Sequence, residues 1–535
     1  MTWATVPAVA EGTIEPTTVI ELVLGLLVLV TLAVTASRRL GIPYPIMLVV
    51  GGLLLGFVPG LPQPQLAPEL AFLIFLPPLL FAAGYFTSLR DFRADLRAIS
   101  LLAVGLVLVT IVAVALVLHL LLPGLPLAAA FVMGAIVAPP DAVAATAIAQ
   151  RMGLPRRIVT ILEGESLIND ATALVAYRVA VAAVLSGSFS LVDAGLSFVG
   201  VAAGGVVAGL VVGYATVLLL RHLTDPPVEV TITLLAPFAA YISAESLAVS
   251  GVLATVTAGI LVGHRAPRVM SSETRLIGSG AWQMMLFVLN GLVFILIGLQ
   301  LPSILAELDR SPVELVGLAL AVSLTVIVVR LVWVFPGAYL PRLLSRSLRE
   351  RDPYPPWQRV FVLGWTGMRG IVSLAAALAL PLDFPERGLF LFVTLSVIVA
   401  TLVGQGLTLP FVMRALGVTG DTYHEEEEAH ARTMASQAAS ARIGRLYDEW
   451  PAHRELIEHL QAQYTHRDRH LAENQGDGMS IEAETELIEH GRIRRAVIDA
   501  ERDAIIGLRD RGAISAEALR RVERDLDLEE LRLEA

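Results

Sequence analysis

The sequence predicts an all-α polytopic membrane protein with about 13 transmembrane helices and a soluble helical C-terminal tail. Of its 535 residues, 55% are hydrophobic, and the mean hydropathy of +0.70 exceeds that of a soluble chain. Apolar runs long enough to cross a bilayer recur as far as residue 412. From Asp421 onward the chain is strongly charged instead, with 27 acidic residues and 16 arginines.

These observations predict a transmembrane domain at 1–415 and a cytoplasmic helical regulatory tail at 416–535. The first 420 residues contain 22 acidic residues and 23 arginines, so they are almost neutral. The chain has no cysteine, which excludes disulfides, thiolate metal sites and a thiol nucleophile. All 39 basic residues are arginines. Because the apolar part of the chain is almost neutral and the tail is acidic, we expect the lipid bilayer as a partner of the chain and no nucleic acid.

Thirteen apolar runs are candidate spans. Most have the roughly 20 residues that a transmembrane helix needs, whereas the eighth and ninth are short and share the least defined border. The runs are 17–36, 42–60, 67–86, 98–122, 126–149, 160–185, 192–220, 228–244, 249–263, 276–300, 313–337, 357–380 and 388–412.

The arginines of the connecting loops predict the orientation. Loops after spans 1, 3, 5, 7, 9 and 11 all contain arginine, whereas loops after even-numbered spans contain only Arg310 and Arg387. Because arginine-rich loops stay in the cytoplasm, we expect an outer N-terminus and a cytoplasmic tail. A miscounted helix would have broken the alternation.

Two spans contain signals that interrupt a helix. In span 5, Pro139 and Pro140 remove two amide donors beside Asp141, and in span 12 three glycines surround Arg369. A proline kink and glycine-mediated packing are the simpler explanations of each break alone. The breaks lie seven spans apart, so spans 1–6 and 8–13 would form inverted repeats. Corresponding breaks in such repeats indicate the binding site of a transporter.

The segment EGESLINDA, residues 163–171, places several polar side chains inside span 6. At 1.5 Å per residue, Asp170 lies roughly 15 Å from residue 160, near the middle of the bilayer. Ser166 and Asp170 are four residues apart and share a helix face, as do Glu165 and Asn169. Intramembrane carboxylates are costly and usually functional or paired. We predict a functional role for Asp170, with a salt bridge to another helix as the alternative.

Two further carboxylates have more than one possible role. Glu165 is predicted to form a structural ion pair with Arg330 of span 11, or with Arg369 of span 12, because a buried arginine needs a counter-ion. Asp141 is predicted to take a direct ionic role at the break in span 5. Alternatively, it caps the broken helix.

Several segments resemble, in order, the signatures of the sodium/proton antiporter family that includes bacterial NhaP-type and animal sodium/hydrogen exchangers. The resemblance covers roughly residues 17–415 and implies a 13-helix fold with crossed, broken helices. It also implies a homodimer in the plasma membrane. The segments are APPDAVAAT, EGESLINDA, FVLNGLVFILIGLQLP, VRLVWVFP, GMRGIVSLAAALALP and GQGLTLP.

The resemblance implies a role for each matching residue. Asn169 and Asp170 match the family's Asn-Asp pair, with Asp170 as the carboxylate that binds sodium or a proton. Asp141 is implied as its partner on the broken helix, and Ser166 as a further sodium ligand. Glu165 is implied as a member of a structural ion pair.

The sequence also departs from the family pattern at two positions. Many members have threonine before the broken-helix aspartate, where this chain has Pro140. Only the backbone carbonyl of Pro140 can bind an ion, and we expect it to do so. Many members have a glutamate where this chain has Ala82, so one possible ligand is missing.

The predicted function is secondary active exchange of Na⁺, or of Li⁺ or K⁺, for a proton by alternating access, without a cofactor or an enzymatic step. Asn169 beside Asp170 leaves one titrating side chain, and the chain has no lysine, so we expect electroneutral exchange of one cation per proton. The alternatives are a potassium/proton antiporter and a tail-gated cation channel, which would more naturally show a pore loop or charged rings. An intramembrane aspartyl protease would need two facing aspartates, but its GxGD segment is absent.

Overall fold

The computed structural model describes residues 16–59, 68–141, 143–147, 153–186, 191–306, 308, 310–418, 423–473 and 495–508, together with 511, 522, 526 and 529. Every regular element among these residues is a helix, which confirms the predicted all-α fold. The chain divides into two compact units, Met1–Gly420 and Asp421–Ala535.

The first unit has the helices of a multi-pass membrane protein. Within the described part of the chain, eight helices are long and apolar enough to cross a membrane, and three shorter apolar helices accompany them. Each of the 13 predicted spans overlaps a described helix. The number of crossings and the inverted repeat stay predictions.

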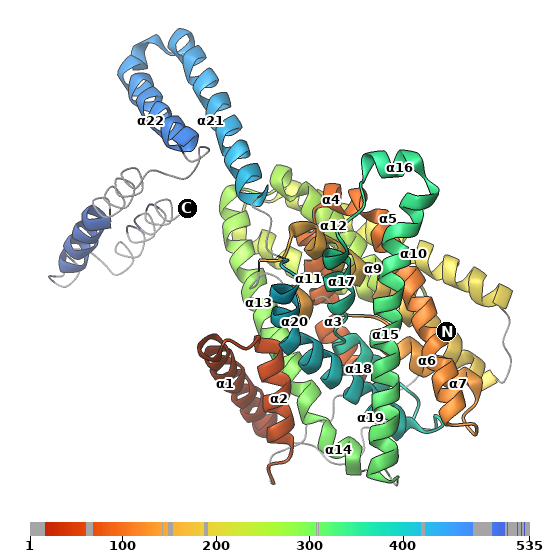
Figure 1. Ribbon diagram of the computed structural model, residues 1–535. Helices are drawn as coiled ribbons and strands as arrows, with labels where there is room; N and C mark the ends of the chain where they lie inside the picture. Colours follow the sequence, from red (N-terminus) through yellow and green to blue (C-terminus); the bar gives the residue numbers. More distant parts are fainter. Residues whose placement is uncertain are drawn as a thin grey trace. The chain divides into compact units, whose positions relative to one another are not determined.

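Seven helices of this unit form what we call the first bundle. α12 packs against α3, α10 and α11, while α13 packs against α2 and α1 (Figure 1). Close helix approach depends on small residues: a Cβ on Gly52 of α2 would collide with the Ile295 carbonyl of α13. The helices are α1 (Pro16–Leu40), α2 (Tyr44–Gly56), α3 (Pro68–Phe86), α10 (Leu191–His222), α11 (Pro226–Ser246), α12 (Gly251–Val269) and α13 (Ser272–Leu299).

The border between predicted spans 8 and 9 lies at residues 247–250. α12 begins after Ser250, whose hydroxyl accepts a hydrogen bond from the Leu253 N–H at 3.2 Å. This is the usual way in which serine caps a helix N-terminus. α11 and α12 are both longer than the apolar runs that predicted them.

The other membrane helices form what we call the second bundle. α6 packs against α7 and α15, and α15 contacts α17 and α19. The elements are α4 (Leu89–Ala94), α5 (Leu96–Ser100), the π-helical turn η1 (Leu101–Leu106), α6 (Val107–Leu121), α7 (Leu127–Val137), α9 (Arg156–Ser186), α15 (Pro312–Leu344), α17 (Trp357–Trp365), α18 (Ile371–Leu378), α19 (Arg387–Val399), the π-helical turn η2 (Ala400–Gln405) and α20 (Gly406–Ala415). Short helices α14 (Leu301–Ala306) and α16 (Arg346–Arg351) flank α15.

Both predicted helix breaks are present in the second bundle. α7 ends at Val137, the two prolines follow, and residues 143–147 are helical again. α17 ends at Trp365, and α18 begins at Ile371 after four further residues and Gly370. The two bundles meet where α9 contacts α3, α10 and α12 and where α18 contacts α3 and α13. The broken and polar elements therefore lie beside the junction between the bundles.

The second unit is a helical tail. α21 (Tyr423–Glu449) and α22 (Arg454–Glu473) form a hairpin joined by the 3₁₀ turn η3 (Pro451–His453) (Figure 1). Ile443 and Ile457 are buried within this unit. Residues 495–508 form a further helix, and the loop predicted at 474–478 lies outside the described residues.

Candidate ion-binding site

The two helix breaks cross and bond to each other. The N–H of Asp141 donates to the Met368 carbonyl at 2.7 Å, which joins the break after α7 to the break before α18. The Asp141 carboxylate accepts a hydrogen bond from the Val143 N–H at 2.8 Å. Its Oδ2 occupies the position that a Cβ of residue 370 would need, so only Gly370 fits there. Asp141 therefore caps the resumed helix while its carboxylate faces the crossing.

Asn169 of α9 holds one of the freed backbone groups. Its amide Nδ2 donates to the Pro140 carbonyl at 2.9 Å, which replaces a hydrogen bond lost at the break. Asn169 is fully buried, and its Oδ1 has no hydrogen-bond partner. An unpaired buried carbonyl oxygen is costly in an apolar interior. Asn169 thus both positions the break and presents an oxygen to a possible cation.

Asp170 is buried beside this crossing. Its side chain is 6% exposed, and it lies close enough to Asp141 for the two carboxylates to repel each other. Ser166 lies one helical turn earlier on α9 and is half-buried. Two neighbouring carboxylates with nearby amide and hydroxyl oxygens make a donor set that suits a hard cation.

Arg369 satisfies backbone carbonyls that the two breaks expose. It is fully buried, and its Nε donates to the Val137 carbonyl at 3.1 Å and its Nη2 to the Ala138 carbonyl at 3.4 Å. Its Nη1 donates to the Gly367 carbonyl. Unpaired carbonyls at membrane depth are costly. Arg369 therefore holds the broken backbone together, a role that the sequence did not predict.

Glu165 pairs with Arg330, the first of the two arginines considered from the sequence. Arg330 Nη1 and Nη2 donate to the two carboxylate oxygens of Glu165 at 2.5 and 2.8 Å. The side chains are 0% and 1% exposed. Arg330 Nη2 also donates to the Leu363 carbonyl of α17 at 3.3 Å. The pair thereby joins α9, α15 and α17.

Thr401 is a site residue that sequence reasoning missed. Its Oγ1 accepts the N–H of Arg369 at 3.1 Å and donates to the Val397 carbonyl at 2.8 Å. A single threonine in an apolar helix is common, so the sequence contains no signal that would have selected it.

The junction between the two bundles has a cavity near each of its ends. A cavity of about 340 Å³ at the end of α1 is lined by Arg38, Tyr44 and Phe287 of the first bundle and by Ala147 of the second. Tyr44 is close enough to Asp141 to interact with it electrostatically. Near the C-terminal end of α11, Arg178 of α9 donates to both carboxylate oxygens of Glu245, each at 2.9 Å.

Broken helices that cross beside buried carboxylates are typical of secondary transporters. The sequence pattern described as "Sodium/hydrogen exchanger, transmembrane" matches residues 25–415. This match covers well over half of the chain, which therefore belongs to the sodium/hydrogen exchanger family.

Individual relatives agree with this family. The chain is 36% identical to an uncharacterized Na⁺/H⁺ exchanger of Mycobacterium tuberculosis (strain ATCC 25618 / H37Rv), covering 96% of this chain and 97% of the relative. It is 35% identical to a sodium, potassium, lithium and rubidium/H⁺ antiporter of Bacillus pumilus (strain SAFR-032), covering 72% and 61%. The fold matches the sodium/proton antiporter MjNhaP1 of Methanocaldococcus jannaschii with a TM-score of 0.60 at 20% identity, covering 75% and 98%.

Proposed function

We propose that this protein is a sodium/proton antiporter whose two substrates compete for Asp170 at the crossing of the broken helices. The observation that supports this most directly is the pair of neighbouring carboxylates, half-buried Asp141 and buried Asp170, beside interrupted backbone. The family membership of the chain agrees with this activity. Purified protein in liposomes containing a pH-sensitive dye tests it: a sodium gradient should drive proton movement in the opposite direction.

The ion site consists of oxygen ligands from α9 and the first break. We assign Asp170 and Ser166 as sodium ligands, with Asp141 and Asn169 beside them. The Pro140 carbonyl already accepts the Asn169 amide, but a carbonyl oxygen has a second lone pair that can face a cation. Water completes the coordination, since sodium is a hard cation that prefers oxygen.

Competition for one carboxylate accounts for the exchange. Sodium and the proton each neutralise Asp170, so both cannot occupy the site together. An ionised carboxylate is costly to carry through an apolar barrier. The second bundle therefore carries the site from one side of the membrane to the other readily only when sodium or a proton is bound to Asp170. Because one ion binds on one side and the other ion on the opposite side, the two movements are coupled.

Alternating access requires the two bundles to move relative to each other. In this structure, the Arg178–Glu245 ion pair joins the bundles near the end of α11, while the cavity beside Tyr44 lies between them near the end of α1. With the orientation proposed from the arginine-rich loops, the ion pair is on the outer side and the cavity on the cytoplasmic side. We propose that this ion pair separates when the bundles move to expose the site to the outside.

Cross-linking the bundles should stop transport reversibly. Arg178→Cys combined with Glu245→Cys introduces two thiols into a chain that has no cysteine. A bis-methanethiosulfonate reagent that bridges them through two disulfides should lower sodium-driven proton flux in proportion to the cross-linked fraction, and a reductant that cleaves these disulfides should restore the flux. The control pair, Arg346→Cys with Glu350→Cys, lies within α16 and should have no effect when bridged. Full exchange by completely cross-linked 178/245 protein would contradict the bundle motion.

Exchange should be electroneutral, with one cation for one proton. Asn169 beside Asp170 offers one titrating side chain, and the chain has no lysine to carry a second proton. Membrane voltage, worth about 2.3 kcal/mol per charge per 100 mV, should then not drive transport. The measurement is the equilibrium sodium ratio in liposomes held at 0 and about −100 mV by potassium and valinomycin. An equilibrium sodium ratio that depends on voltage would contradict electroneutral exchange and would indicate that Asp141 carries a second proton.

A broader cation range is the second candidate function. The Bacillus pumilus relative is a sodium, potassium, lithium and rubidium/H⁺ antiporter, so exchange of K⁺ or Li⁺ by this chain is tested by the same liposomes with a cation series. A tail-gated channel is distinguished by the absence of uphill movement: an imposed proton gradient cannot concentrate sodium through a channel.

We further propose that the protein is a homodimer in the plasma membrane with a cytoplasmic tail, where it contributes to pH homeostasis. The helices of the first bundle expose apolar side chains that are suited to lipid or to a second copy. On α10 these are Leu196, Val199, Val207 and Val211. Native mass spectrometry measures the oligomeric state, and labelling of cysteines introduced into the tail measures its side of the membrane.

A further inference from the structure

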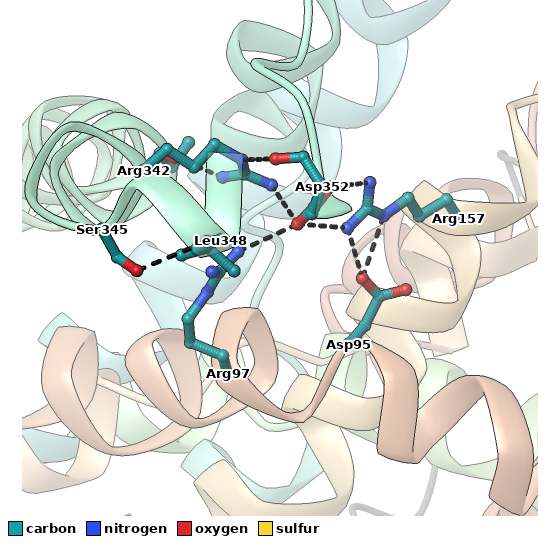
Figure 2. Close-up of polar contacts among 8 residues, drawn as sticks. Asp95, Arg97, Arg157, Arg342, Ser345, Leu348 and Asp352 are labelled. Atoms are coloured by element: carbon teal, nitrogen blue, oxygen red, sulfur yellow. Dashed lines mark hydrogen bonds and ion pairs between the residues drawn. The ribbon is translucent and has the colours of Figure 1, made fainter. Parts of the chain in front are cut away.

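A cluster of arginines joins three parts of the second bundle, at the end that carries the arginine-rich loops after predicted spans 3, 5 and 11. The Asp352 carboxylate accepts hydrogen bonds from Arg97 at 3.0 Å, from Arg157 at 2.9 Å and from Arg342 at 2.6 Å (Figure 2). Arg157 also donates to Asp95, at 2.9 and 2.7 Å. The cluster connects α5, α9 and the end of α15.

A cavity of about 260 Å³ lies beside this cluster, and we call it the arginine pocket. Its lining includes four arginines but one acidic residue, Asp352. Partial burial alone would raise the pKa of the Asp352 carboxyl, but the hydrogen bond from Arg157 and the surrounding guanidinium charges lower this pKa below its usual value. Asp352 is therefore ionised, and the lining still has an excess of positive charge. The arginines are Arg97, Arg157, Arg342 and Arg359.

Arg97 has hydrogen-bonding capacity that the protein does not use. Its Nη2 bonds Asp352, but its Nε and Nη1 are buried and have no hydrogen-bond partner. A buried donor without a partner is costly, and more so when it belongs to a charged group. Arg97 is one of the residues that line this cavity, and guanidinium groups gathered around a cavity with excess positive charge suit a phosphate.

The rest of the pocket is apolar. Leu101, Ile158, Ile161, Val334 and Leu363 form much of its wall. Tyr354 lines it as well and is exposed, as aromatic residues commonly are at the boundary between membrane and water. A ligand that fits this pocket has an anionic head and an apolar portion.

We propose that the arginine pocket binds the phosphate group of an anionic phospholipid of the cytoplasmic leaflet, with part of an acyl chain along its apolar wall. The leaflet rests on the orientation proposed above. Basic pockets between helices on the cytoplasmic side suit such headgroups. Because the bound phosphate would contact α5, α9 and α15 together, it would stabilise the packing of the second bundle.

The test is the thermal stability of the full-length protein in neutral detergent, titrated with dioleoyl phosphatidylglycerol. Binding to the folded state raises Tm with ligand concentration. Arg97→Gln should weaken the apparent affinity for the lipid about tenfold, as expected for a lost charged hydrogen bond. The control Arg346→Gln changes an arginine of α16 that is 83% exposed and should leave the affinity unchanged.

A second variant tests the pocket without removing charge. A Cβ on Gly337 would meet no atom within 4 Å, and Gly337 lines the pocket. Gly337→Leu should therefore fill the pocket in a folded protein and weaken lipid binding. The matched control is Gly317→Leu, since Gly317 lies on the same helix with equally open space around it.

The titrations distinguish the source of the phosphate. A rise in Tm that phosphatidylglycerol causes, that inorganic phosphate does not, and that both pocket variants weaken supports the proposal. A rise with inorganic phosphate alone, lost in Arg97→Gln, would overturn the lipid as the source. Equal lipid affinity in wild type, Arg97→Gln and Gly337→Leu would overturn the site itself.

Discussion

Replacing Asp170 by asparagine is expected to abolish sodium/proton exchange while leaving a folded, membrane-inserted protein. An amide neither binds sodium with a negative charge nor releases a proton, so the site can no longer alternate between its two substrates. The shape of the side chain is almost unchanged, and the hydrogen bonds described above between the two breaks come from Asn169, Arg369 and the Asp141 backbone. The measurement is sodium-driven proton flux in liposomes, alongside the Tm of the purified variant.

A neighbouring carboxylate provides the matched control for this variant. Glu163 is on the same helix, two turns nearer the arginine-rich end, and is half-buried. Glu163→Gln removes one negative charge from α9 without touching the crossing, so exchange should persist. Near-normal flux by well-folded Asp170→Asn protein would show that another group binds the ion.

Removing Glu165 should destabilise the protein as well as lower its activity. Glu165→Ala leaves the guanidinium of Arg330 buried without its counter-ion, which costs about 3–5 kcal/mol for a fully buried pair. Both partners are almost completely buried and bonded through two hydrogen bonds, so we expect the upper part of this range. The measurement is a drop in Tm in detergent together with reduced flux in liposomes.

Double variants distinguish the ion pair from a simple loss of packing. Exchanging the two residues, Glu165→Arg with Arg330→Glu, should recover part of the stability. Replacing both by leucine should be less harmful than Glu165→Ala alone, because no unpaired charge stays buried. A swap of Glu165 with Arg369 should recover nothing, since Arg369 bonds backbone carbonyls. A stable and active Glu165→Ala protein would contradict the structural role.

The sequence predicted much of this architecture because membrane crossing leaves strong local signals. Apolar length located the helices, and Pro139-Pro140 and the glycines around Arg369 located both breaks. The two short runs at spans 8 and 9 are longer helices in the structure, because α11 and α12 extend beyond their apolar parts to Ser246 and Val269. Helix ends of mixed polarity carry no hydropathy signal.

The sequence could not decide every contact that is made across the fold. Arg330 was the predicted partner of Glu165, but Arg369 stayed an alternative, since both are isolated charges in apolar runs. Their difference lies in geometry: Arg330 extends from an unbroken helix, whereas Arg369 lies within a break whose carbonyls need donors. The bond between the Asp141 N–H and the Met368 carbonyl involves backbone atoms alone, so no side-chain pattern predicts it.

The Glu165–Arg330 ion pair and Arg369 also contribute to the net charge of the ion-binding site. Three carboxylates, on Glu165, Asp141 and Asp170, lie near two guanidiniums, on Arg330 and Arg369. With every group ionised, the empty site has one negative charge in excess, and a single bound sodium ion or proton brings it to zero. A second cation would give the site a net positive charge, and moving that charge through a medium of low dielectric constant would again cost Born energy. In the proposed exchange, the two arginines would thus also limit the cargo to one positive charge each time the site changes sides.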